Sequence, residues 1–204
     1  MFSVIIPTMW LSDKTKCLIE EFVSSELTNE IIIIDNNNSN SIELDNSLKK
    51  IKIIKNKKNI YVNPSWNLGV ELSQNDDIII SNDDLCIKKV DRILKKIKKS
   101  KFDLIGLNLE NINKSPDVII DRKEGPMKKG FGCFFYIRKK KYQPIDNDIK
   151  IWYGDNILHD SISNKGIISF NEIDIELSKT VKSTNNLIEI LENDKNVYRR
   201  KYKN

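Results

Sequence analysis

Short runs of isoleucine and valine alternate along the first half of the chain with stretches in which apolar side chains recur every three or four positions. Unbroken β-branched runs bounded by polar residues are typical of short buried strands, whereas the longer period is that of an amphipathic helix. Strands that alternate with helices form parallel βαβ units with right-handed crossovers. The expected strands are residues 2–6, 30–35, 52–54 and 78–80, and the expected helices are residues 12–23, 63–72 and 90–97.

After residue 101 this alternation is lost. Apolar runs continue without clear helices between them, so mixed or antiparallel pairing is expected in this half. One helix, starting at Asp155, precedes the last strand. The whole pattern predicts an α/β fold with a mixed, mainly parallel central sheet flanked by helices. The expected strands of this half are residues 102–107, 117–121, 132–138 and 167–170.

Single residues predict where several elements begin or end. Pro7 should stop the first strand, because proline has no N–H to donate to a ladder. Ser12 can cap the first helix. Asn63 as N-cap, followed by Pro64 at the first helical position, is typical of a helix start. Gly166 is suited to end the later helix.

The end of the chain, from Thr184, is amphipathic and finishes in a basic cluster. Leu187, Ile188 and Leu191 are expected on one face of a helix there. We therefore expect one domain over residues 1–182, followed by a C-terminal amphipathic helix and basic tail over residues 183–204.

Composition agrees with one domain and excludes several classes of protein. The 204 residues, 39% of them hydrophobic, are enough for one sizeable core. Lys and Arg number 34 against 29 Asp and Glu, and the resulting charge of +5 is too mild to predict a nucleic-acid partner. No signal peptide and no apolar run of about 18 residues is visible, so a soluble, cytoplasmic protein without a transmembrane segment is expected.

The three cysteines predict neither a disulfide framework nor a zinc site. Cys17, Cys86 and Cys133 are odd in number, widely spaced and without a C-x-x-C pair. We expect buried thiols in a reducing compartment.

The triplet Asn82-Asp83-Asp84 follows the central apolar run directly. Open α/β sheets bind their ligands at the carboxyl ends of their strands. Two adjacent carboxylates repel each other there, so they are tolerable if they bind a divalent cation through oxygen, or if they cap the next helix. Both interpretations are open from the triplet alone.

Six stretches in this order and spacing resemble the GT-A fold glycosyltransferases, particularly family 2, whose members are inverting, metal-dependent and use nucleotide-diphosphate sugars. The resemblance covers residues 2–182 and implies a single Rossmann-like GT-A domain, with a nucleotide-binding half over about residues 1–100 and an acceptor half over about residues 101–182. The stretches are residues 3–8, residues 33–36, Asn59 with residues 65–69, residues 82–84, residues 130–134 and residues 152–155.

For the donor, the resemblance implies that Pro7 and Thr8 lie beside the nucleotide and that Asp35 accepts a hydrogen bond from the base. A carboxylate suits the imide N–H of uracil or thymine, because it can only accept. Asn67 resembles a polar helix residue near the diphosphate. The alternatives to these ligand-binding roles are structural: Asp35 could be a turn or cap residue, and Asn67 could be a surface or capping residue.

For the metal, the resemblance puts the triplet in place of a D-x-D motif. Asp84 would then ligate Mn²⁺ or Mg²⁺, with Asn82 at the other outer position and Asp83 touching the ribose or the metal's waters. Asparagine at the first position removes one charge. A late histidine ligand found in many relatives would fall near residues 176–178 and is missing.

For the chemistry, Asp155 matches the general base of the inverting members, which takes the proton of the acceptor hydroxyl. The residue before it is usually acidic and here is Gly154, so an N-cap role for Asp155 stays open. Trp152 and Tyr153 could stack on an acceptor sugar or pack in the core. His159, the only histidine, is expected at the acceptor or at the surface.

Together these features predict a transferase that moves a sugar, with inversion, from a UDP- or dTDP-linked donor to a hydroxyl of a glycan, glycoprotein or glycolipid. The oligomeric state is not specified. One alternative is a degenerate GT-A domain that binds without turnover, supported by Asn82 and Gly154. The other is a sugar nucleotidyltransferase, although residues 7–10 lack the glycines that a phosphate-binding loop there would need.

Overall fold

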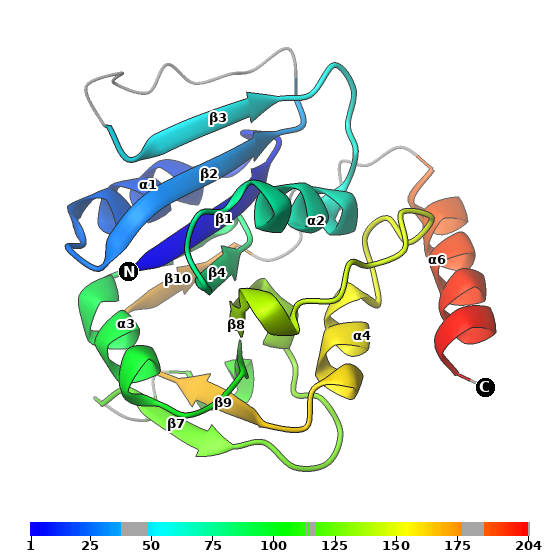
Figure 1. The fold of residues 1–204 in the computed structure, drawn as a ribbon. Helices are drawn as coiled ribbons and strands as arrows, with labels where there is room; N and C mark the ends of the chain where they lie inside the picture. The colour runs from blue at the N-terminus through cyan, green and yellow to red at the C-terminus, as the bar shows by residue number, and fades with distance from the viewer. Residues whose placement is uncertain (38–48, 113, 115–116, 177–185, 204) are drawn as a thin grey trace.

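An eight-stranded mixed sheet forms the centre of the fold, running from β3 at the top of Figure 1 to β7 at the bottom. The computed structural model describes residues 1–37, 49–112, 114, 117–176 and 186–203. The strand order is β3-β2-β1-β4-β8-β6-β9-β7, in which β3, β2, β1 and β4 are parallel and β8 runs against both β4 and β6. The predicted α/β class and mainly parallel sheet are confirmed.

The strands of this sheet lie close to the predicted runs. A second, two-stranded ribbon of β5 and β10 was not predicted. The strands are β1 (Phe2–Thr8), β2 (Thr28–Asp35), β3 (Ile51–Lys55), β4 (Asp77–Ser81), β5 (Leu85–Ile87), β6 (Leu104–Leu107), β7 (Ile119–Arg122), β8 (Phe134–Arg138), β9 (Lys165–Ser169) and β10 (Ile173–Ile175).

Helices cover both faces of the sheet. Short 3₁₀ turns, η1 (Leu109–Asn111), η2 (Phe131–Cys133) and η3 (Lys139–Lys141), connect the strands of the second half. The α-helices are α1 (Lys14–Ser24), α2 (Val62–Leu72), α3 (Val90–Lys99), α4 (Gly154–Ser161) and α6 (Leu187–Tyr202). No helix among the described residues is long and apolar enough to cross a membrane.

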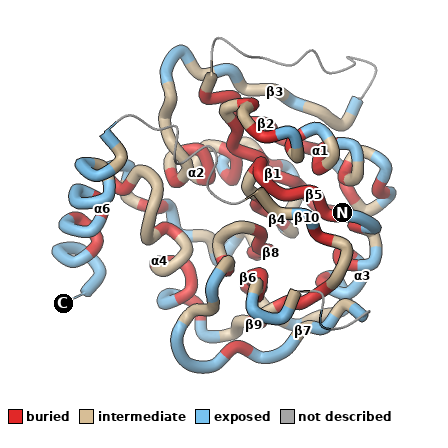
Figure 2. Tube along the Cα trace, turned by 180° about the vertical axis from the view of Figure 1, so that it is seen from behind, coloured by how far each residue is buried: buried red, intermediate tan, exposed pale blue. Residues whose placement is uncertain are grey.

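Successive side chains of the central strands point to opposite faces of the sheet, and the interior is therefore divided into two hydrophobic cores. On β2, Ile31 and Ile33 face the core under α1 and α3, whereas Ile32 and Ile34 face the core under α2 and α4. Successive side chains of a strand point to opposite faces, so an unbroken isoleucine run fills both cores at once. Figure 2 shows these central strands buried along their length.

Three predicted boundaries are wrong, each because tertiary contacts outweigh the local signal. β1 continues through Pro7, which is tolerated because the pairing with β4 ends at Ile5 and leaves no neighbour on that side. Helix α2 begins at Val62, not at Asn63, whose backbone and side chain bind Lys150 and Trp152 instead. Gly166, the expected helix stop, lies inside β9.

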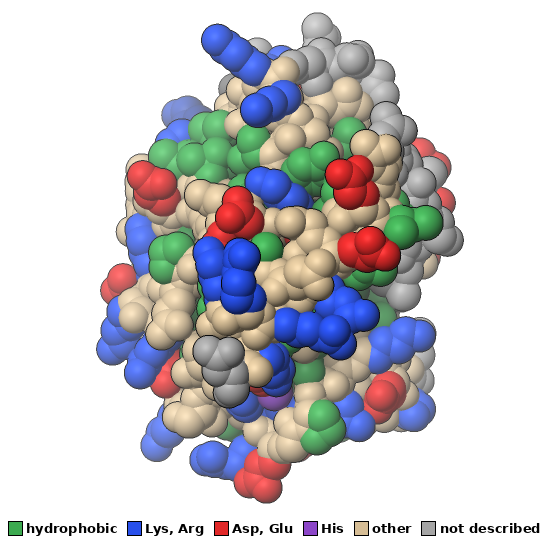
Figure 3. Space-filling view, turned by 90° about the vertical axis from the view of Figure 1, so that its right-hand side faces the viewer, with side chains coloured by type: hydrophobic (Ala, Val, Ile, Leu, Met, Phe, Trp, Pro, Cys, Tyr) green, Lys and Arg blue, Asp and Glu red, His purple; other side chains and the backbone are tan. Residues whose placement is uncertain are grey.

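The C-terminal helix exists, but its predicted apolar face is wrong. Ile188 is 75% exposed and Leu191 is 38% exposed, whereas Asp194, Val197 and Tyr198 are buried. The packing of α6 against the rest of the domain therefore determines which of its faces is buried. On this side of the molecule, Lys and Arg side chains are interspersed with Asp and Glu over the surface (Figure 3).

Two of the three cysteines are not free thiols. Cys17 of α1 and Cys86 of β5 are joined as a disulfide, with their Cα atoms 5.6 Å apart, and Cys133 is free. The two partners are 69 residues apart in sequence, and α1 is brought against β5 only by the fold.

The close approach of α2 to β1 gives the first prediction. A Cβ at Gly69 would lie 2.4 Å from Cγ2 of Ile5. Gly69→Ala should therefore lower the free energy of unfolding by about 1–3 kcal/mol, although alanine in an exposed helix is favoured over glycine by about 1 kcal/mol. Urea denaturation measures the change.

The control is Glu71→Ala, an exposed position on the same helix, for which a change within about 0.5 kcal/mol is expected. A Gly69→Ala variant more stable than the wild type would contradict the packing argument.

Candidate functional site

A cavity of about 440 Å³ opens at the carboxyl ends of β1 and β4. It lies at the edge of the sheet where the parallel strands end, which is the usual ligand site of open α/β folds. Its walls come from both halves of the chain. The lining residues are Pro7, Thr8, Met9, Asn36, Asn59, Tyr61, Val62, Trp66, Asn82, Asp83, Asp84, Gly130, Gly132, Cys133, Ile151, Trp152, Tyr153, Asp155 and Asn156.

Thr8 and Asp83 are joined across the ends of β1 and β4. The Thr8 hydroxyl donates to Oδ2 of Asp83 over 2.7 Å and accepts the N–H of Trp10 over 2.8 Å. Trp10 has a φ of 58°, in the left-handed region that few non-glycine residues adopt. The loop after β1 and the Asn-Asp-Asp triplet thus form one hydrogen-bonded unit.

The backbone of the triplet is held by three other segments. The N–H of Asn82 donates to Cys133 O over 2.8 Å, the Thr15 hydroxyl to Asp83 O over 3.0 Å, and the N–H of Glu176 to Asp84 O over 2.8 Å. The next helix, α3, begins only at Val90, with β5 in between. Asp83 and Asp84 therefore do not cap it, and a metal-ligand role for the triplet stays a prediction.

The segment that would carry a late histidine passes this triplet. Glu176 lies beside Asp84 through the backbone bond just described, and its carboxylate Oε2 accepts the Ser12 hydroxyl over 3.4 Å. Residues 177–178, the other positions named for that ligand, lie outside the described residues.

Asp155 lies in the first turn of α4 and faces the same cavity. The N-cap residue is Tyr153, so Asp155 is not the cap, and its Oδ1 accepts the N–H of Asn156 over 3.0 Å. Burial raises the pKa of its carboxyl group above the ordinary value, opposed in part by the backbone N–H groups of Asn156, Asp155 and Gly132. The site therefore holds a carboxylate that binds a proton more readily than a free aspartate.

Two glycines fit tightly around Asp155. A Cβ at Gly132 would lie 2.6 Å from Oδ2 of Asp155. At Gly154 it would lie 2.1 Å from Oδ1 of Asn63. An acidic side chain at position 154 therefore has no room beside Asn63, which explains this departure from the family pattern by packing.

Cys133 connects the two acidic groups of the site. Burial, followed by the negative charges of Asp84 and Asp155, raises the pKa of its thiol to about 12. Both carboxylates thus act on the same thiol from within one cavity, and Cys133 stays neutral at physiological pH. No pattern in the sequence singled out this position beyond its place in a glycine-containing stretch.

Two of the predicted site residues do not line the cavity. Asp35 is buried at the end of β2, and its Oδ1 accepts the N–H of Asn37 over 2.9 Å. Asn67 donates to Ile145 O over 2.7 Å and accepts the Tyr142 hydroxyl over 2.8 Å, so its amide anchors the chain before α4. Pro7, Thr8, Asn82, Asp83, Asp84 and Asp155 do line it.

Asn36, next to Asp35, lines the cavity and fixes the loops that follow β2 and β3. Its Nδ2 donates to Oγ of Ser65 over 3.0 Å, and its Oδ1 accepts Nδ2 of Asn56 over 2.9 Å. These bonds join the ends of β2 and β3 to α2. The sequence marked Asn36 only as part of a motif, because its partners are distant in the chain.

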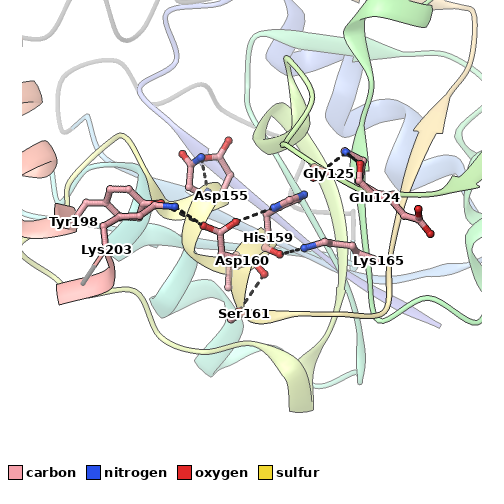
Figure 4. A network of polar contacts seen from close by, with 12 residues as sticks. Glu124, Gly125, Asp155, His159, Asp160, Ser161, Lys165, Tyr198 and Lys203 are labelled. Atoms are coloured by element: carbon pink, nitrogen blue, oxygen red, sulfur yellow. Dashed lines mark hydrogen bonds and ion pairs between the residues drawn. The ribbon is translucent and has the colours of Figure 1, made fainter.

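His159 is neither at the surface nor in the cavity wall. It is 4% exposed, lies with its ring edge-on to Phe131 at a centroid distance of 5.3 Å, and has Nδ1 3.1 Å from Oδ1 of Asp160 (Figure 4). Burial lowers its pKa, against the opposing influence of Asp160. The expectation of a surface or acceptor position is wrong, because His159 lies on the face of α4 that packs against Phe131 of η2.

The raised pKa of Asp155 gives a stability prediction. The folded state binds the Asp155 proton more tightly than the unfolded chain, so the charged carboxylate weakens the fold above that pKa. Asp155→Asn should raise the melting temperature at pH 7. The gain should shrink as the pH falls towards the ordinary aspartate pKa of about 3.9, where the wild type is neutral too.

Asp160→Asn on the same helix is a control of opposite sign. Burial acts to raise the pKa of Asp160, but hydrogen bonds from His159 and Lys203 outweigh this effect, and the pKa is lowered. Its ionised form therefore stabilises the fold, and the variant should lose stability at pH 7, with the loss fading as the pH falls through that lowered pKa. Thermal melts from pH 3 to 8 that show a loss for both variants would refute the assignment for Asp155.

Solved structures share this fold. Residues 1–349 of S. aureus TarS in complex with UDP align with a TM-score of 0.61 at 11% identity, over 99% of this chain and 72% of that one. The same fragment in complex with UDP-GlcNAc gives 0.57 at 13% identity, over 93% and 64%. The inositol-1-phosphate CTP transferase from T. maritima gives 0.51 at 12% identity, over 95% and 96%.

At these identities the likeness is one of fold, and the fold is shared by proteins with different reactions. No curated protein sequence matches the chain significantly. Residues 3–157, which include every cavity-lining residue, match the family described as Glycosyl transferase family 2. The chain therefore belongs to glycosyl transferase family 2.

Proposed function

We propose that the protein transfers a sugar from a UDP- or dTDP-linked donor to a hydroxyl of a glycan, glycoprotein or glycolipid, with inversion at the anomeric carbon. One observation carries the proposal: Asp84 and Asp155, from the two halves of the chain, line one cavity. Such a transfer needs two kinds of side chain: one that helps to bind the diphosphate and one that accepts a proton.

The donor side is formed by the ends of β1, β2 and β4. Pro7 and Thr8 would lie along the nucleotide, with Asn36 and Asn59 as further polar groups of that wall. Asp35 lies one residue from this wall and holds the turn through Asn37. A direct bond from Asp35 to a uracil or thymine imide stays a prediction.

The donor set at the triplet fits Mn²⁺ or Mg²⁺. Asn82, Asp83 and Asp84 offer only oxygen ligands, which these hard cations prefer. Within the part of the chain that the structure describes, no three His, Cys, Asp or Glu side chains are placed so that they could hold a metal ion together, so the diphosphate and water would complete the coordination. When bound, the cation supplies positive charge that stabilises the departing nucleoside diphosphate.

On the opposite wall, Asp155 would accept the proton of the acceptor hydroxyl as that oxygen attacks the anomeric carbon. Its raised pKa makes its carboxylate a stronger base than that of an ordinary aspartate. The hydroxyl enters opposite the leaving phosphate, so one displacement inverts the configuration. Trp152, in the same wall, offers an aromatic face to an acceptor sugar.

A nucleotidyltransferase is the second candidate, because a CTP transferase shares the fold. Against it stand the family match and the loop of residues 7–10, which has no glycine for a triphosphate. A panel of UDP, dTDP, GDP and CDP sugars, measured by thermal shift with and without Mn²⁺, separates the two. The proposal expects stabilisation by UDP or dTDP sugars that depends on Mn²⁺, followed by slow release of UDP or dTDP.

Replacing the proposed metal ligand should remove the metal-dependent part of donor binding. In Asp84→Ala, the affinity for UDP measured by calorimetry should no longer increase on adding Mn²⁺, and chelation with EDTA should bring the wild type to the same level. Asp121→Ala, an exposed position on β7, is the control and should keep the wild-type response. An unchanged Mn²⁺ response in Asp84→Ala would remove Asp84 from the metal site.

Replacing the proposed base should stop the chemistry but not donor binding. Asp155→Asn keeps the size of the side chain and loses the proton acceptor, so turnover should fall by about 10²–10⁴-fold. Asp121→Asn, the same chemical change at an exposed position on β7, should turn over at a rate close to that of the wild type.

The wild-type rate should also fall in acid as Asp155 is protonated, with a midpoint above the ordinary aspartate value of about 3.9 because burial raises its pKa. NMR of the fresh product should show inverted anomeric configuration. Retention would exclude this role for Asp155 even if the variant were inactive.

A further inference from the structure

We propose that α6 belongs to the active site: Asp194 is a positioning residue that fixes the backbone of residues 150–152 and so presents Trp152 and Asp155 to the acceptor. This inference rests on the proposed transferase function. It concerns a helix outside the segment that matches the family, which ends at residue 157.

Asp194 is the most buried charged side chain of α6, with none of its surface exposed. Its Oδ1 accepts the N–H of Lys150 over 2.8 Å, and its Oδ2 accepts the N–H groups of Ile151 over 2.8 Å and Trp152 over 3.0 Å. Three successive N–H groups that converge on one carboxylate form an anion-binding nest. Hydrogen bonds to an ionised acceptor are also about twice as strong as neutral ones.

The opposite edge of the same segment is held by α2. The N–H of Asn63 donates to Lys150 O over 2.9 Å, and its Nδ2 donates to Trp152 O over 3.1 Å. The segment is therefore clamped between Asp194, which binds its N–H groups, and Asn63, which binds its carbonyl groups. This use of Asn63 also explains why it does not act as the N-cap of α2.

A second contact from α6 supports the turn into α4. Tyr198 stacks on Tyr153 with ring centroids 4.6 Å apart and an angle of 14° between the planes. Tyr153 has a φ of 65°, which is unfavourable for a non-glycine residue and persists only where surrounding contacts hold it. Tyr198 and Lys203 also approach Asp160 at 3.4 and 3.3 Å, as Figure 4 shows on the side of α4 away from Gly125.

These contacts act on one wall of the cavity only. Ile151, Trp152 and Tyr153 line it and lead directly to Asp155, whereas the donor wall is built on β1, β2 and β4. If Asp194 positions this wall, its loss should disturb the placement of the base and of the acceptor while the nucleotide still binds. A merely structural role would lower stability without separating these two effects.

The test compares Asp194→Asn with Glu192→Gln, the same change of carboxylate to amide at an exposed position of the same helix. Backbone hydrogen exchange is measured on the free proteins, UDP binding with Mn²⁺ by calorimetry, and turnover as release of UDP from the UDP sugar that stabilises the wild type most. Asp194→Asn should exchange faster at residues 150–153 but not in β1, β2 or β4. Its kcat should fall by about 10–10²-fold, the cost of a misplaced reacting group.

The affinity for UDP and the KM for the UDP sugar should stay within about twofold of the wild type, because the loss is in the transition state and not in donor binding. Glu192→Gln should match the wild type throughout. Unchanged exchange at residues 150–153, or faster exchange with unchanged kcat, would overturn the proposal, as would an equal loss of UDP affinity.

Tyr198→Leu gives the same test if Asp194→Asn does not fold. It keeps an apolar side chain and removes the stacking on Tyr153, so exchange at residues 150–153 and kcat should change in the same directions. The exchange measurement needs no ligand. A wild type that neither binds UDP nor releases it from a UDP sugar would therefore overturn the proposed function, while the exchange data would still decide whether α6 fixes this wall.

Discussion

The register between β1 and β4 is the constraint on which the site depends. The pairing of Ile5 with Ile80 brings the end of β1 beside the triplet that follows β4, so that the Thr8 hydroxyl reaches the carboxylate of Asp83. A slip of one residue would turn every side chain of the strand to the opposite face. Such a slip would also separate Thr8 from Asp83 and remove the hydrogen bond that joins the two strand ends.

The site gathers negative charge where water is largely excluded, and this has an energetic cost. Burial raises the pKa values of both Asp155 and Cys133, and the Cys133 shift has contributions from Asp84 and Asp155. The ionised Asp155 carboxylate therefore weakens the fold unless a ligand or a cation compensates its charge, whereas the neutral Cys133 thiol has no such effect at physiological pH. Acidic groups kept at the expense of stability are typical of functional sites, and this is the physical reason for placing the proposed chemistry here.

The two walls of the cavity are built in different ways. The donor wall consists of strand ends held by the parallel sheet, which is rigid because the strands are buried on both faces. The other wall is an irregular segment that has no sheet partner and is held instead by single side chains, Asn63 from α2 and Asp194 from α6.

The sequence by itself determined the α/β class and the two-faced burial of the isoleucine strands, because these follow from local periodicity. That Thr8, Asp83, Asp84 and Asp155 lie at one site was implied by the resemblance to the glycosyltransferases and not by any local pattern. The sequence could not show that Asn67 is used as an anchor, that Gly154 is required beside Asn63, or that Cys17 meets Cys86. It also misjudged the buried face of α6, where Asp194, Val197 and Tyr198 are buried while Ile188 and Leu191 are exposed. These features depend on side chains that meet across 40 to 90 positions of sequence, and only tertiary packing decides which polar group finds a partner there.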